Sequence, residues 1–257
     1  MTPSRLRLAV SGTYSTGKTT TTEALSVATG IPRTHAMTSR EILVDLVPGK
    51  QVQELTAREL TALGLRRLEE RIQHEAEQAG SFIADGSVIH EWIYGVARMR
   101  AGINPGAGPL VKTLKVVAGL PYRSFYRQYL DAYGTVTRAR AKRTYDAYVH
   151  LPVEFPMTAD GHRPVSEKFR RLSDQLLIQT LRELKIPYHI VGGTVTERLE
   201  QIIRIFDLPR VMPLDEAIGV ATERVRQATA ILEADARRCA QQPARSLRRR
   251  IKSRLRY

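Results

Sequence analysis

The sequence is short of several residues and patterns that would define other classes of protein. It has a single cysteine, Cys239, which excludes an internal disulfide and a cysteine-cluster metal site and favours a reducing, cytoplasmic setting. Its six histidines show no H-E-x-x-H or similar spacing, so we predict no zinc site. No apolar run approaches the roughly 18–20 residues of a membrane span. The first residues also lack the basic-then-apolar order of a secretory leader.

Acidic residues are missing from one region. Residues 236–257 contain nine Lys or Arg and no Asp or Glu, so they carry nine of the fourteen net positive charges and leave about +5 for the rest. A tail of this kind can contact RNA, DNA or an anionic lipid surface. It can equally be a disordered, solubilising end. Both interpretations remain open.

The clearest motif that is present lies near the N-terminus. Residues 12–19 read GTYSTGKT and fit G-x-x-x-x-G-K-[ST], the phosphate-binding P-loop. Lys18 is expected to reach the β- and γ-phosphates, and the Thr19 hydroxyl to ligate Mg²⁺. A strand pattern precedes the motif and a helix pattern follows it, as this loop requires. The predicted nucleotide contacts are Gly12, Thr13, Tyr14, Ser15, Thr16, Gly17, Lys18, Thr19 and Thr20.

Short apolar runs alternate with helical patterns along the chain. This alternation indicates βαβ units and an α/β three-layer sandwich with a mainly parallel, five-stranded sheet. The expected strands are 6–10, a short segment after Pro32, 82–84, 147–151 and 188–191. The expected helices are 18–28, one starting at Thr38 or Ser39, 52–79, 88–100, a basic and aromatic insert over 110–143, 166–184 and 194–206. On the helix 52–79, Arg66, Arg67, Glu69 and Glu70 are expected on the polar side.

Three units are expected. A P-loop domain covers residues 1–208 and includes the insert at about 110–143, a helical extension covers 209–240, and the basic tail covers 241–257. In the extension an apolar residue recurs every three or four positions from Leu214 to Leu232, which predicts one apolar stripe on a long helix. Such a stripe docks on the domain or on a partner, so a homodimer is possible.

Two further groups are candidates for chemistry. Asp85 ends the strand predicted over 82–84, at the edge of a parallel sheet where ligands bind. It can position Mg²⁺, accept a proton from an attacking hydroxyl, or simply cap the next helix. Arg163, in the loop 160–163, can close on the nucleotide and neutralise the transferred phosphoryl group. Arg170 and Arg171 are alternatives, and a solvated loop arginine is the other interpretation.

These features together resemble one family. The P-loop, Asp85, the strand ending at Leu151, the loop 160–163 and the ending HIVGGT at 189–194 are similar to P-loop small-molecule kinases related to the ribosylnicotinamide-kinase domain of bacterial NAD regulators, and more distantly to nucleoside and nucleotide kinases. The resemblance spans about residues 5–207. It implies ATP and Mg²⁺ as cofactors, with phosphorylation of a small-molecule hydroxyl beneath a lid. It further implies Asp85 as the strand-end acid and metal-side group, Arg163 as the lid arginine, and Gly193 beside the adenine.

The acceptor is less defined, because Asp85 is followed by Gly86-Ser87 where nucleoside kinases have an arginine. Two regions flank the acceptor side in these kinases: Arg40 and Glu41 after the second strand, and Glu91, Trp92, Tyr94 and Arg98 after Asp85. Of these, Arg40, Glu41, Trp92 and Arg98 are the predicted substrate-binding residues. Trp92 can stack on a base or pack in the core. The tyrosines of the insert can line an acceptor pocket, bind single-stranded nucleic acid, or form part of the core.

Three functions follow from these patterns. The first is an ATP-dependent kinase acting on a small-molecule hydroxyl, with a nucleoside-like acceptor among the candidates. The alternatives are an ATP-dependent nucleic-acid-associated or regulatory NTPase, and a protein that binds nucleotide without catalysis. The chain has neither the N-K-x-D motif of signalling GTPases nor an L-S-G-G-Q-like signature of ABC ATPases.

Overall fold

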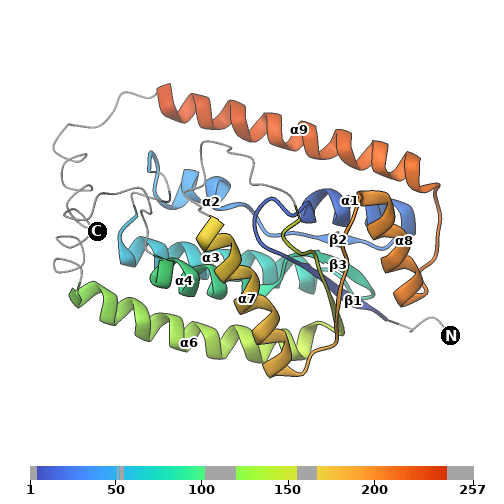
Figure 1. Ribbon diagram of the computed structural model, residues 1–257. Helices are drawn as coiled ribbons and strands as arrows, with labels where there is room; N and C mark the ends of the chain where they lie inside the picture. Colours follow the sequence, from blue (N-terminus) through green and yellow to red (C-terminus); the bar gives the residue numbers. More distant parts are fainter. Residues whose placement is uncertain (1–4, 51, 53–54, 102–119, 155–166, 242–257) are drawn as a thin grey trace.

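The computed structural model describes the chain apart from residues 1–4, 51, 53–54, 102–119, 155–166 and 242–257. Five parallel strands form one sheet in the order β2-β3-β1-β4-β5 (Figure 1). The fold class predicted from the sequence is confirmed. The strands are β1 (Arg7–Ser11), β2 (Arg33–Thr34), β3 (Phe82–Asp85), β4 (Ala147–His150) and β5 (Tyr188–Ile190).

Helices cover both faces of the sheet, because side chains alternate along each strand and both sides are apolar. Leu8 and Val10 of β1 pack with one group of helices, and Ala9 packs with another on the opposite face. The first group is α1 (Lys18–Thr29), α8 (Val195–Phe206) and α9 (Leu214–Gln241). The second is α3 (Ala57–Ala76), α4 (Val88–Ala101), α6 (Leu120–Thr144) and α7 (Glu167–Leu184). The short α2 (Ser39–Leu46) forms a smaller core with α3.

Capping boxes fix where three helices begin. Thr38 with Glu41, Thr56 with Glu59, and Thr194 with Glu197 each exchange side-chain and backbone hydrogen bonds. The helix predicted from residue 52 therefore begins at Ala57, because Thr56 satisfies its first free N–H groups. The capping box expected at Thr194 is confirmed.

The predicted polar side of α3 is wrong in part. Glu70 has only 6% of its surface exposed, and Arg67 points inward to an ion pair with Glu91 on α4. Helix α3 packs against α2 on one side and against α4 and α6 on others, so more than one of its faces is buried. Charge pairing across these contacts makes such burial tolerable.

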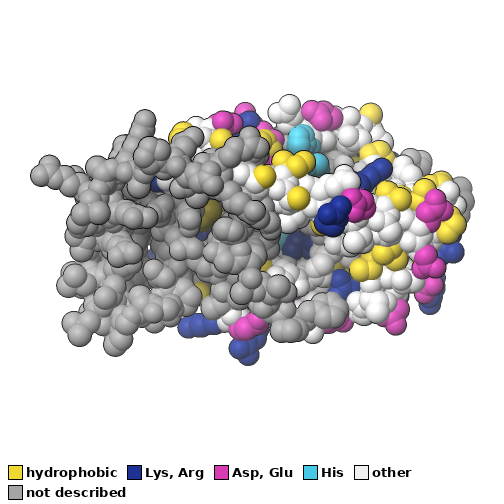
Figure 2. Space-filling view, turned by 90° about the horizontal axis from the view of Figure 1, so that it is seen from above, with side chains coloured by type: hydrophobic (Ala, Val, Ile, Leu, Met, Phe, Trp, Pro, Cys, Tyr) yellow, Lys and Arg dark blue, Asp and Glu magenta, His cyan; other side chains and the backbone are white. Residues whose placement is uncertain are grey.

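The long helix α9 lies across α1 (Figure 1). Leu214, Ala217 and Ala221 are buried in the core shared with α1 and α8, so the first half of the predicted stripe docks on the domain. Further along, Ile231 is 64% exposed. Seen from this side (Figure 2), acidic, basic and apolar side chains are mixed over the described part of the surface. Among the described residues, no helix has the length and apolarity needed to cross a membrane.

Candidate active site

The P-loop connects β1 to α1 at the carboxyl edge of the sheet. Gly12 has φ of 145°, and a Cβ there would lie 2.7 Å from the Leu151 carbonyl oxygen, so a larger residue does not fit. Gly17, with φ of 83°, is the left-handed residue that starts α1. The loop therefore curls in front of the helix N-terminus, where free N–H groups and the helix dipole attract a phosphate.

Several side chains donate hydrogen bonds to the backbone carbonyl oxygens of this loop. The Thr13 carbonyl accepts the Thr16 hydroxyl at 3.0 Å and the Lys18 ammonium at 2.6 Å. Two buried arginines, Arg170 of α7 and Arg198 of α8, donate to the carbonyls of Tyr14 and Thr16. Neither arginine contact follows from a local sequence pattern.

Asp85 lies beside the P-loop, as its predicted role requires. Its Oδ2 accepts a hydrogen bond from Nη2 of Arg33 at 2.7 Å. Nη1 of Arg33 also forms an ion pair with Oε2 of Glu23 on α1 at 3.1 Å. Burial opposes the charge, but Arg33, Lys18 and a hydrogen bond from Thr19 outweigh it, so the pKa of Asp85 lies below its usual value. An ionised Asp85 next to Thr19 suits a position beside a cation better than the role of a proton acceptor.

The turn after Asp85 is held by His90. The Ser87 N–H donates to His90 Nδ1 at 2.9 Å, which closes the first turn of α4. Burial, together with the charges of Lys18 and Arg71, lowers the pKa of His90 well below its usual value. A neutral His90 therefore fixes the Asp85–Ser87 turn without adding charge near the P-loop.

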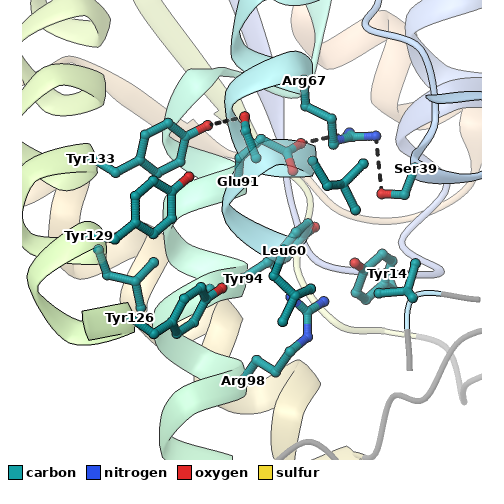
Figure 3. A pocket seen from close by; sticks show the side chains of 15 residues that line it. Tyr14, Ser39, Leu60, Arg67, Glu91, Tyr94, Arg98, Tyr126, Tyr129 and Tyr133 are labelled. Carbon is teal, nitrogen blue, oxygen red and sulfur yellow. Dashed lines mark hydrogen bonds and ion pairs between the residues drawn. The ribbon is translucent and has the colours of Figure 1, made fainter. Parts of the chain in front are cut away.

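A pocket opens beside the P-loop between α2, α3, α4 and α6 (Figure 3). Tyr14 belongs both to the P-loop and to the pocket wall, and its ring stacks on Tyr94 with centroids 4.7 Å apart. The Tyr94 hydroxyl donates to the Gly12 carbonyl at 3.4 Å. The lining residues are Tyr14, Ser39, Val52, Leu60, Leu63, Gly64, Arg67, Glu91, Tyr94, Gly95, Arg98, Tyr126, Tyr129, Leu130 and Tyr133.

Charged groups on two helices meet in this pocket. Arg67 of α3 and Glu91 of α4 are 2.6 Å apart, and Arg67 also donates to the Met37 carbonyl at 2.8 Å. Burial works against the Glu91 charge, but Arg67, Arg71 and Arg98 lower its pKa below the usual value. The pocket thus presents a fixed carboxylate and guanidinium side by side.

Tyrosines of α6 form the opposite wall. Tyr129 and Tyr133 are stacked with centroids 5.2 Å apart, and the Tyr133 hydroxyl donates to the Gly64 carbonyl at 2.9 Å. Burial raises the pKa of both hydroxyls, so they stay protonated. The tyrosines of the insert therefore line a pocket and also form part of the core.

The predicted substrate residues separate into different places. Arg98 lines the pocket, one and two helical turns from Tyr94 and Glu91. Trp92 is not among the lining residues: it packs on Gly134 and lies under Arg138, 5.7 Å from guanidinium carbon to ring centroid. Position 92 is rotated about 100° from position 91 on a helix, which directs the ring towards α6. In this structure Trp92 is in packing contact with α6, and its predicted stacking on a base stays a prediction.

The other predicted residues lie elsewhere or are not described. The Glu41 carboxylate accepts the Thr38 N–H at 2.6 Å and caps α2. The N–H of Gly193, in the loop before α8, donates to Glu154 at 3.0 Å. The side chain of Arg40 and the whole of Arg163 lie outside the described residues.

Comparisons with known proteins place this geometry in a family. A family model described as an AAA domain matches residues 7–198, about three quarters of the chain. The chain belongs to this AAA domain family. A search of curated protein sequences finds no match.

Solved structures share the fold of this AAA-domain chain. Deoxyadenosine kinase from M. mycoides, with products dCMP and dCDP, gives a TM-score of 0.53 at 14% identity, covering 79% of this chain and 98% of that one. The NadR protein with NAD and AMP-PNP gives 0.52 at 13% identity, covering 82% of this chain and 52% of that one. The resemblance to a P-loop kinase fold is confirmed.

Proposed function

We propose that this protein is an ATP-dependent kinase that transfers the γ-phosphoryl group to a hydroxyl of a small, nucleoside-like molecule. One observation carries the proposal: the polar, aromatic pocket shares Tyr14 with the P-loop. An acceptor in this pocket lies next to the phosphates, and proximity of the two reactants is the main requirement for phosphoryl transfer. The likeness to deoxyadenosine kinase and NadR in fold supports the same reading.

In this proposal the P-loop residues from Gly12 to Thr20 hold the ATP phosphates, with Lys18 on the β- and γ-phosphates. Thr19 and Asp85 are the oxygen ligands that fit Mg²⁺, since both are hard donors and Asp85 is held ionised. When bound, Mg²⁺ neutralises charge on the phosphates. Gly193 lies in the loop proposed to contact the adenine.

The acceptor pocket supplies recognition by hydrogen bonding and stacking. Glu91 accepts hydrogen bonds from acceptor hydroxyls, and Arg67 keeps it ionised and oriented. Tyrosine rings on two walls offer flat surfaces to a planar group. Arg98 sits where a polar edge of the acceptor can be bound.

In the transfer step the acceptor oxygen forms a bond to the γ-phosphorus while the bond to the β-γ bridging oxygen breaks, and ADP leaves. The hydroxyl proton passes to water or to a phosphate oxygen, because a loose transition state needs little base catalysis. Asp85, with its lowered pKa, is assigned to positioning. Arg163 remains the proposed lid arginine, and it lies outside the described residues.

The test is a panel of hydroxyl-bearing acceptors, nucleosides included, incubated with radiolabelled ATP and Mg²⁺. We expect label to appear in one acceptor class, with transfer by Lys18→Ala lower by at least about a hundredfold. ADP formation that is independent of every acceptor would favour an NTPase, and nucleotide binding without turnover would favour a non-catalytic binder. Either result would overturn the kinase proposal.

The nucleic-acid-associated alternative receives no specific support from the described residues. Tyr126, Tyr129 and Tyr133 line the pocket rather than an open surface. Its direct test is deletion of the residues after Gln242, followed by measurement of salt-sensitive RNA or DNA binding and of ATP turnover.

A further inference from the structure

Arg170 and Arg198 are the two largest side chains among those that are fully buried in the described part of the chain. Their exposed fractions are 0% and 1%. Burying a guanidinium is costly unless charge and hydrogen bonds compensate it. The groups that each arginine contacts therefore show how its burial is compensated.

Each arginine joins one carboxylate to one P-loop carbonyl. Arg170 donates through Nε to the Tyr14 carbonyl at 3.1 Å and through Nη1 to Glu167 at 2.8 Å. Arg198 donates through Nη1 to the Thr16 carbonyl at 2.7 Å and through Nη2 to Glu154 at 2.8 Å. The two carbonyls that accept these bonds, those of Tyr14 and Thr16, lie two residues apart in the same loop.

The arginines approach from opposite faces of the sheet. Helix α7 packs in the core with α4 and α6, and helix α8 packs in the core with α1 and α9 (Figure 1). On the α7 side, Phe169 also stacks on the Tyr14 ring with centroids 5.9 Å apart. The loop is thus held between two rigid helices that are far from it in sequence.

Holding a carbonyl also orients the next N–H, because the C=O and N–H of a trans peptide point in opposite directions. With the Tyr14 carbonyl on Arg170, the Ser15 N–H faces the other way. With the Thr16 carbonyl on Arg198, the same holds for the Gly17 N–H. These are N–H groups of the kind that a P-loop directs at phosphate oxygens.

We propose that Arg170 and Arg198 are positioning residues that hold the phosphate loop in its anion-binding conformation before the nucleotide arrives. Glu154 extends this arrangement, since it also accepts the Gly193 N–H at 3.0 Å and so links Arg198 to the loop before α8. The proposal rests on the nucleotide-binding part of the proposed function and does not depend on the acceptor.

The experiment measures ADP affinity by isothermal titration, because ADP lacks the γ-phosphate. Arg170→Lys and Arg198→Lys keep the charge but lose the planar fork that binds a carboxylate and a carbonyl together. We expect each to weaken ADP binding about tenfold, the loss typical of a charge-assisted hydrogen bond. The exposed arginines Arg182 of α7 and Arg204 of α8 provide matched controls, and their Lys variants should bind ADP as the wild type does.

A second pair of variants protects the test from misfolding. Glu167→Gln and Glu154→Gln alter exposed partners of the arginines, and each should weaken ADP binding by about threefold. A purely structural role predicts a lower melting temperature with unchanged ADP affinity in the folded variants, and that result would overturn the proposal. So would a loss confined to ATP, which would make Arg170 a γ-phosphate contact.

Failure of the two proposals is distinguishable. If no acceptor is phosphorylated while ADP binding responds as described, only the kinase proposal fails. If the wild type binds neither ADP nor ATP, the nucleotide site itself is contradicted, and the positioning role of both arginines with it.

Discussion

The P-loop and the neighbouring pocket are the two halves of the proposed site, and they are built in different ways. The P-loop is eight consecutive residues whose conformation depends on two glycines and the start of a helix. The pocket collects side chains from the P-loop, α2, α3, α4 and α6, over more than a hundred residues. A local motif can be recognised in sequence, whereas a surface assembled from distant helices becomes visible only after folding. The following predictions test whether the two halves are also separate in function.

The largest expected effect is that of Lys18→Ala. Removing the ammonium should lower phosphoryl transfer by about 10²- to 10³-fold, the usual loss when one transition-state donor is removed. Acceptor binding to the pocket, measured by titration without nucleotide, should be unchanged. Lys142→Ala, at an exposed position on α6, is the control. A parallel loss of acceptor binding would show that the two halves are not separate.

Asp85→Asn should affect stability. Breaking the Asp85–Arg33 pair leaves a largely buried guanidinium with less compensation, so the free energy of unfolding at neutral pH should fall by about 3 kcal/mol. Because the folded-state pKa of Asp85 is lowered, its contribution is present above the unfolded value of about 3.9 and lost as pH falls below it.

The gap in stability between wild type and Asp85→Asn should therefore shrink in acid. Urea unfolding at neutral pH and below about pH 3 provides the measurement. A gap of the same size at both pH values would contradict the ionised state assigned to Asp85.

Glu91→Gln should act on the pocket alone. We expect the KM for the acceptor to rise about tenfold, as for loss of a charged hydrogen-bond partner, with the KM for ATP unchanged. Glu69→Gln is a matched control, since Glu69 is an exposed acid on α3. An equal rise in both KM values would show that Glu91 does not act on the acceptor alone.

Trp92→Phe should have the smallest effect. The indole packs on Gly134 and under Arg138, so its loss should cost about 1 kcal/mol of stability and leave both KM values unchanged. Thermal unfolding and steady-state kinetics check this. A selective rise in the acceptor KM would instead support the interpretation that Trp92 stacks on a base.

Much of the fold was predictable because its signals are local. The strands at 82–85 and 147–150 were found from short apolar runs, and the box at Thr194 from its Glu197 partner. The start of α3 was missed although Thr56 and Glu59 form the same kind of box. The apolar residues at 52 and 55 extended the helical period past the true cap.

The site was predictable only in part. Asp85 and Arg98 were predicted from their places at the end of β3 and in the following helix. The structure puts Asp85 beside the P-loop and Arg98 in the pocket, and their roles stay predictions. Arg67 was assigned to the solvent side of α3, because periodicity treats a charged residue as exposed. Its actual surroundings depend on Glu91, 24 positions away on another helix.

The sequence by itself determined the P-loop, the parallel sheet and the sheet edge at which the P-loop lies, since each depends on neighbouring residues and on strand order. The tertiary structure alone decided which charges are buried and what they hold. Arg33 meets Asp85, Arg67 meets Glu91, and Arg170 and Arg198 meet the P-loop carbonyls. The physical reason is that a buried charge is stabilised by specific partners in space, and no spacing along the chain encodes them.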